Sequence, residues 1–168
     1  MGHEINNLIE ADESSFFAAR EISNALLEIR RDLFSKISNH FKTYFKRTLN
    51  TNQIITSNYV FDIILDMDKA DGHYVGLILN KNHKEISDTT VLRELCEITG
   101  GTAGNNIYFK WFSLECIPRN LDSYSDEQAY TLLQDEKLNE LYIIIDTEIS
   151  DFINRFKSEL KGKNQTIL

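Results

Sequence analysis

The sequence has few of the residues that interrupt or cross-link a chain. Its 168 residues include one proline, seven glycines and two cysteines. Cys96 and Cys116 stand outside any CxxC or Cys/His cluster, so neither a disulfide framework nor a zinc site is indicated. We expect both to be small core residues, and a pairing of the two stays open. The chain is long enough for one sizeable core. We therefore expect a single domain over 1–168, with flexible ends at 1–13 and 163–168.

Long apolar runs are also missing. No stretch approaches the ~20 apolar residues that a membrane-spanning helix needs. The first residues, MGHEINNLIEADE, lack the basic start and apolar core of a signal peptide. We therefore expect a cytoplasmic protein without a membrane partner.

Positive charge is scarce overall but concentrated locally. The net charge of −8 opposes non-specific attraction to nucleic acid or anionic lipid. Segment 28–49 carries six basic residues against two acidic ones, a balance of +4, whereas segment 122–160 carries ten acidic residues against three basic ones, a balance of −7. Such segments are typical of the solvated faces of two helices that can also attract each other.

Residues 59–80, YVFDIILDMDKADGHYVGLILN, predict a β-hairpin with one wholly apolar face. A two-residue loop would mix apolar and polar residues on each face. A three-residue loop of Ala70-Asp71-Gly72, with Gly72 in the left-handed conformation, keeps the faces separate. The cross-strand pairs expected from that loop are Met67 with Val75, Leu65 with Leu77, and Ile63 with Leu79.

A long amphipathic helix is predicted before the hairpin, because Ser14 to Leu49 contains neither glycine nor proline and its apolar residues recur at steps of three and four. Asp12 or Ser14 is the expected N-cap. Unbroken, this helix would run about 50 Å, so we expect a break near Ser23-Asn24. The polar segment 50–58 is expected to connect the helix to the hairpin.

Three more elements are expected after the hairpin. Asp88 or Thr89 can cap a short helix that ends at Gly100-Gly101. A strand at 107–117, apolar on both faces and stopped by Pro118, is typical of a central position. A final helix follows a capping box of Ser125 with Gln128 and extends to Lys161. This order predicts an α+β fold, a small antiparallel sheet packed by two long helices and a short one.

Carboxylates on the second face of the hairpin form a candidate metal site. Asp66 and Asp68 share a strand face about 7 Å apart, and Asp62 precedes them on the same face. The DMDKADG segment departs from an EF-hand loop, because its glycine is one position late and strands flank it. Solvated residues that discourage edge pairing are the favoured interpretation, and no cofactor is expected.

Other candidate features favour structural roles. The glycine-rich GGTAGNN lacks a Walker lysine and runs from a helix into a strand, so a connector is favoured over a phosphate cradle. The four histidines show no metal-ligand spacing, and His40 is expected on a helix surface. Trp111 in YFKWFSLE could stack on a nucleic-acid base, but a core aromatic is the commoner case.

A resemblance extends over roughly Ala25 to Leu160. The amphipathic helix, the hairpin ending in YVGLILN, the aromatic strand NNIYFKWFSLE and the final helix resemble the accessory domain of some PD-(D/E)XK nuclease-superfamily proteins. The nuclease signature needs an acid followed, on the next strand, by Glu/Asp-x-Lys. Asp62 or Asp66 could supply the first acid, but NKN and YFKW offer no Glu/Asp-x-Lys, so the resemblance assigns no catalytic residue.

These observations favour a non-enzymatic binding or regulatory protein that acts through protein–protein contacts, for example a phage or mobile-element inhibitor or an immunity-type protein. Another protein is the expected partner, nucleic acid is the less favoured one, and a homo-oligomer is compatible with the sequence. The acidic final helix is the expected contact surface, through Glu140, Glu148, Asp151 and Glu159. Two alternatives stay open: a metal-dependent, nuclease-like enzyme using Asp62, Asp66 and Asp68, and a nucleic-acid-binding module using Arg30, Arg31, Lys42, Lys46 and Arg47.

Overall fold

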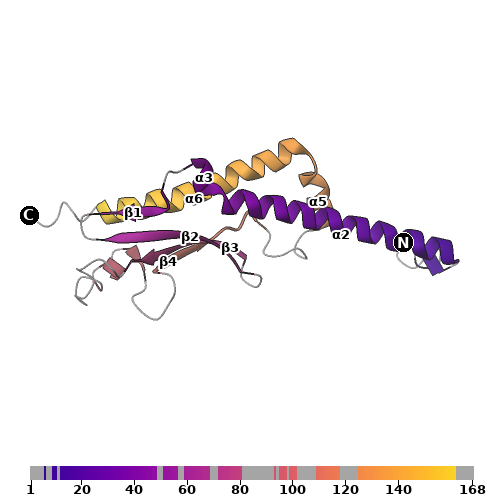
Figure 1. Ribbon diagram of the computed structural model, residues 1–168, viewed down its shortest axis with the longest axis horizontal. Helices are drawn as coiled ribbons and strands as arrows, with labels where there is room; N and C mark the ends of the chain where they lie inside the picture. Colours follow the sequence, from indigo (N-terminus) through magenta and orange to yellow (C-terminus); the bar gives the residue numbers. More distant parts are fainter. Residues whose placement is uncertain are drawn as a thin grey trace, which may run out of the picture.

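The protein has the predicted α+β architecture, with helices over one face of a four-stranded antiparallel sheet (Figure 1). The computed structural model describes residues 12–48, 51–56, 59–68, 72–80, 109–117 and 125–161, together with positions 6, 9, 10, 93, 95–97 and 99–101. The strands, in sheet order, are β1 (Gln53–Ile55), β2 (Val60–Asp68), β3 (Gly72–Leu79) and β4 (Lys110–Ser113). The helices are α2 (Glu13–Lys42), α3 (Tyr44–Thr48), α5 (Asp126–Leu132) and α6 (Asp135–Lys161).

Helix α2 is a single 30-residue helix, so the predicted break near Ser23-Asn24 is wrong. The interruption lies instead at Thr43, between α2 and α3. Both residues are exposed, where their low helix propensity costs only a few tenths of a kcal/mol. Asp12 is the N-cap, as predicted, and its side chain accepts a hydrogen bond from the Ser15 backbone N–H. Most of the predicted flexible ends lies outside the described residues, whereas Asp12 and Glu13 belong to this helix start.

The hairpin is confirmed, but its register differs from the prediction by two residues. Leu65 opposes Val75, Ile63 opposes Leu77, and Phe61 opposes Leu79. Asp68 pairs with Gly72, so the three connecting residues are 69–71, which lie outside the described residues. Gly72 has a φ of 97°, as the turn prediction required. Because a two-residue shift preserves alternation, the predicted face of each side chain survives the error.

The two outer strands also differ from the prediction. Strand β1 lies inside segment 50–58, which was expected to be a connection, and its middle residue Ile54 is buried. Strand β4 covers only Lys110–Ser113 of the predicted 107–117 and lies at an edge of the sheet, not at its centre. Leu114 and Ile117 are buried without belonging to the strand, which explains why the apolar pattern continues past its end.

The core lies between the sheet and the helices above it, α6 and the C-terminal half of α2 (Figure 1). Phe61 of β2 meets Phe156 of α6 edge to face at 4.9 Å, and Phe112 of β4 stacks on Phe152 of α6 at 5.5 Å. The predicted capping box of Ser125 with Gln128 begins α5. The single helix expected from there to Lys161 is wrong, because α5 ends at Leu132 and α6 begins at Asp135.

The short helix is helical at the described positions 93, 95–97 and 99, while its predicted caps Asp88 and Thr89, and residues 102–106 of GGTAGNN, lie outside the described residues. None of the helices that the structure describes is long and apolar enough to cross a membrane.

Candidate functional site

One face of the sheet is turned away from α2 and α6, and we call it the outer sheet face. Strand alternation and the cross-strand register assign its members, because residues that oppose each other point to the same side. It contains a row of apolar and aromatic side chains flanked by carboxylates. Its residues are Gln53, Ile55, Val60, Asp62, Ile64, Asp66, Tyr74, Gly76, Ile78, Asn80, Trp111 and Ser113.

Trp111 is the most unusual member of the outer sheet face. Its side chain is 63% exposed, so the prediction of a core aromatic is wrong. It opposes Gly76, which has no side chain, and its ring meets the ring of Tyr74 edge to face at 6.4 Å. Ile55, on the opposite edge strand, is 69% exposed. Large apolar groups therefore face solvent at both edges of this sheet face.

The position of β4 explains how this exposure arises from the sequence. The inward residues of β4 both contact α6. Phe112 stacks on Phe152, and the Nζ of Lys110 lies 5.7 Å from the centre of the Phe156 ring. Trp111 lies between them in sequence and must therefore point outward. A strand with apolar residues on both faces is typical of the centre of a sheet. Here β4 is an edge strand, and its second apolar face is exposed.

Asp62 and Asp66 lie on the outer sheet face, as predicted. The carboxylate of Asp62 accepts hydrogen bonds from the Gln53 amide at 2.7 Å and the Asn80 amide at 3.4 Å. Asp66 accepts one from the backbone N–H of Met67 at 2.7 Å. The side chain of Asp68 lies outside the described residues. Over the described part of the chain, no three histidine, cysteine or acidic side chains gather closely enough to hold a metal ion.

The four acidic residues of α6 proposed as a contact surface have two different environments. Glu140 and Asp151 are exposed, and Glu140 pairs with Lys137 one turn away. Glu148 and Glu159 are half-buried and contact residues in and after β4. Glu159 accepts a hydrogen bond from Lys110 at 2.8 Å, and Glu148 accepts one from the Cys116 thiol at 3.4 Å.

Two of the five basic residues predicted to bind nucleic acid form ion pairs with acidic residues of α5 and α6. Arg30 of α2 forms an ion pair with Asp126 of α5. Arg47 of α3 donates two hydrogen bonds, of 2.8 and 2.9 Å, to the Asp146 carboxylate of α6. The opposite charges of segments 28–49 and 122–160 therefore attract the helices to each other, which was the favoured interpretation of the charge pattern.

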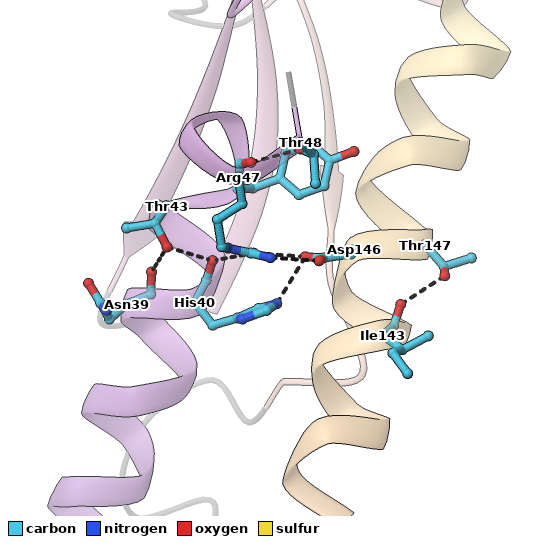
Figure 2. Close-up of polar contacts among 9 residues, drawn as sticks. Asn39, His40, Thr43, Arg47, Thr48, Ile143, Asp146 and Thr147 are labelled. Atoms are coloured by element: carbon cyan, nitrogen blue, oxygen red, sulfur yellow. Dashed lines mark hydrogen bonds and ion pairs between the residues drawn. The ribbon is translucent and has the colours of Figure 1, made fainter. Parts of the chain in front are cut away.

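Figure 2 shows that His40 also contacts Asp146, beside Arg47. The His40 Nε2 lies 3.0 Å from Asp146 Oδ1. The His40 ring also stacks on Tyr142, with centroids 3.9 Å apart. Because a carboxylate only accepts, Nε2 must carry the proton. Arg47 also donates to the His40 backbone carbonyl at 2.8 Å. His40 is thus part of a helix junction, and the prediction of a simple surface position is wrong.

The ionisable groups of this junction are shifted by burial and by one another. Burial lowers the pKa of His40 despite the neighbouring Asp146 carboxylate. Burial alone would raise the pKa of Asp146, but the hydrogen bond from Arg47 and the charges of His40 and Arg47 outweigh it and lower that pKa. An ionised Asp146 between two donors binds the C-terminal end of α2, together with α3, to α6.

Two further perturbed groups are His73, which lies in the packed interior, and Cys116, which like Cys96 is only half-buried against the core. His73 is fully buried on the inner face of β3, with Nε2 3.2 Å from Ser38 Oγ and its ring edge-on to Phe34 and Phe41. Burial lowers its pKa to about 4. Burial and the charge of Glu148 raise the pKa of Cys116 to about 12. Both groups are neutral at pH 7, as core packing requires.

Comparison with known proteins assigns this chain to no family. No family model, curated protein or solved structure matches the chain. The resemblance to the nuclease-associated accessory domain therefore stays a prediction.

Proposed function

We propose that this chain is a cytoplasmic, non-enzymatic protein-binding module of the regulatory or inhibitory kind, and that it binds its partner through the outer sheet face. The single observation that carries the proposal is the exposure of Trp111, 63%, in the middle of an ordered strand. Large aromatic side chains on a sheet are normally covered, and contiguous exposed apolar groups are typical of interaction sites.

The chemistry of this face suits a protein partner. Tryptophan and tyrosine supply much of the binding energy in protein interfaces. Trp111 and Tyr74 rest against each other and stand on paired strands, so little side-chain freedom remains to be lost on binding. Ile55, Val60, Ile64 and Ile78 extend the apolar area across the other strands.

The charges beside this face specify the kind of partner. Asp62 and Asp66 lie among the apolar residues of the face. A partner that fits would place an apolar pocket over Trp111 and rim that pocket with lysine or arginine. The net charge of −8 favours the same choice and opposes phosphate.

The perturbed ionisable groups support a binding role over catalysis. His73 and Cys116 owe their shifts first to burial, and neither lies on the outer sheet face. His40 and Asp146 are used to join helices. Each shift is thus accounted for by packing or by a helix contact, whereas a catalytic pair would be directed at a substrate.

The test is to isolate the partner with the tagged wild-type chain, identify it by mass spectrometry, and measure binding of the purified pair by calorimetry. Trp111→Ala should weaken binding by about thirtyfold or more, the effect of losing a hot-spot aromatic. Tyr130→Ala is the matched control, because Tyr130 is an exposed aromatic on α5, 71% exposed. Equal affinity of Trp111→Ala and wild type would overturn the proposal.

A further inference from the structure

Asp62 is a carboxylate without a counter-charge in the middle of the outer sheet face. It stands on β2, one of the two central strands, and is half-buried. Its hydrogen-bond donors, the side-chain amides of Gln53 and Asn80, are both neutral. None of the basic side chains that the structure describes forms an ion pair with it. A negative charge in a partly desolvated position is unfavourable until a cation neutralises it.

The two amides also determine which side of the Asp62 carboxylate is open. Gln53 lies on β1 and donates to Oδ1, whereas Asn80 directly follows β3 and donates to Oδ2. The amides therefore approach from the strands on either side of β2. Each oxygen accepts one hydrogen bond, and a carboxylate can accept about four. The side directed away from the sheet is left for a further donor, and an arginine guanidinium can donate to both oxygens at once.

The inner face of the same sheet shows how an aromatic contact and one ion pair hold a helix. Phe152 of α6 stacks on Phe112 of β4. Glu159, seven residues further along α6, accepts a hydrogen bond of 2.8 Å from Lys110 of β4. Residues seven positions apart lie on the same face of a helix, about 10.5 Å apart along its axis.

The outer sheet face carries the same two kinds of group, with the charge reversed. Trp111 supplies an exposed aromatic ring, and Asp62 supplies an acidic group. Asp62 opposes Ile78 of β3, and Trp111 opposes Gly76, two residues away on that strand. Asp62 and Trp111 are thus two strand spacings and two residues apart, which corresponds to about 12 Å between their Cα atoms. This separation matches the axial distance between helical residues seven positions apart.

We propose that the outer sheet face binds a basic amphipathic helix of a partner protein. An arginine of that helix pairs with Asp62, and an apolar residue seven positions away packs on Trp111. This inference rests on the proposed function, because it names the element that the partner presents to this face. The net charge of −8 attracts a basic helix and repels an acidic one. The sheet would then be covered by helices on both faces, which is a stable layer arrangement.

Synthetic helical peptides test the proposal with a defined probe. The probe is a helix-stabilised peptide of alanine and glutamine, about four turns long, with one arginine and one leucine seven positions apart. Trp111 fluorescence and the amide chemical shifts of β2, β3 and β4 should report binding at high micromolar concentration. The control peptide has the same composition with the arginine moved by two positions, to the opposite side of the helix, and should bind at least about fivefold more weakly. Equal binding of the two peptides, or no response to either at millimolar concentration, would overturn the proposal.

Variants of Asp62 test the ion pair itself. Asp62→Asn should weaken binding of the probe peptide by about tenfold and remove most of its salt dependence. Asp151→Asn, which removes an exposed acidic group of α6, is the matched control and should leave binding within about twofold. Unchanged affinity of Asp62→Asn would contradict the proposal.

A charge exchange tests the same contact with a second variant. Asp62→Lys should bind a peptide in which glutamate replaces the arginine, and should reject the original probe. The amides of Gln53 and Asn80 can turn their carbonyl oxygens toward the new lysine, so the fold should tolerate it. A preference of Asp62→Lys for the arginine peptide would overturn the proposal.

The natural partner, once isolated with the wild-type chain, separates this inference from the proposed function. Loss of affinity in both Trp111→Ala and Asp62→Asn would support the outer sheet face and the arginine contact together. Loss in Trp111→Ala alone would keep the outer sheet face as the binding surface and overturn the arginine contact. Unchanged affinity in both variants would overturn both.

Discussion

The two faces of the sheet are built from the same strands, yet only one of them is packed. On the inner face, Phe61, Ile63 and Leu77 are at most 2% exposed beneath α6 and α2. On the outer face, Trp111 and Ile55 are more than 60% exposed. Apolar character alone therefore does not determine burial in this protein. The position of the two long helices determines which face becomes the core, and the other face keeps apolar groups that folding does not require.

Neighbouring residues of β2 offer the largest contrast between the two faces. Ile63 opposes Leu77 in the core, so Ile63→Ala should lower the free energy of unfolding by about 2–5 kcal/mol. Ile64 points to the outer face, and Ile64→Ala should cost less than about 1 kcal/mol. Denaturant unfolding of both variants measures the difference. Equal losses would show that the outer face is packed too.

His73 makes the inner face sensitive to pH. Its pKa falls from 6.5 to about 4 on folding. As pH drops, the unfolded chain takes up the proton first, so stability is full above about pH 6.5 and is lost progressively down to about pH 4. The loss from this residue is about 3 kcal/mol.

His73→Gln should flatten that part of the stability profile relative to wild type, which urea melts between pH 8 and pH 4 would reveal. An unchanged slope would mean that His73 is not buried as a neutral ring.

The junction of Figure 2 holds α2 and α3 against α6, the helices that cover the inner face. A double-mutant cycle with Arg47→Met and Asp146→Asn should give a coupling energy of about 1 kcal/mol, because the pair is bidentate and half-buried. The exposed pair Lys137–Glu140 is the control, with an expected coupling of about 0.3 kcal/mol. Equal coupling energies in the two cycles would show that the Arg47–Asp146 pair contributes no more than an exposed surface ion pair.

The smallest expected effect concerns the acidic residues of α6. Glu140 and Asp151 lie on the helix layer and not on the outer sheet face, so Glu140→Gln with Asp151→Asn removes only long-range charge and should weaken partner binding by about twofold while reducing its salt dependence. Glu148→Gln with Glu159→Gln removes groups that bond to Cys116 and Lys110, and should affect stability more than binding. Calorimetry at two salt concentrations compares the variants. Unchanged affinity in the first variant would remove this surface from the binding model.

The sequence predicts the elements well because alternation and helical periodicity are local. The hairpin, the capping box of Ser125 and the two long helical regions follow from spacing alone, although each region is divided into two helices. The two-residue error in the hairpin register has a physical origin, since such a shift preserves both faces and depends only on the loop. Leu65, expected opposite Leu77, is only half-buried, and the buried Ile63 opposes Leu77 in its place.

The candidate site was harder to predict because exposure depends on tertiary structure. Trp111 and Phe112 are adjacent aromatic residues of one short strand, and only the position of α6 decides that Phe112 is covered and Trp111 is not. The junction of His40 with Asp146 joins residues 106 positions apart, a distance at which no local pattern indicates a contact. The opposite charges of the two helical segments were the one available signal.

The most direct test of the outer sheet face uses Trp111 as its own reporter, because it is the only tryptophan of the chain. Acrylamide quenching of its fluorescence should be efficient in the free protein, with emission typical of a solvated indole, and should fall sharply when the purified partner is added. A tryptophan that is shielded in the free protein, or equally quenched in the free protein and in the complex, would contradict the assignment of this face as the binding surface.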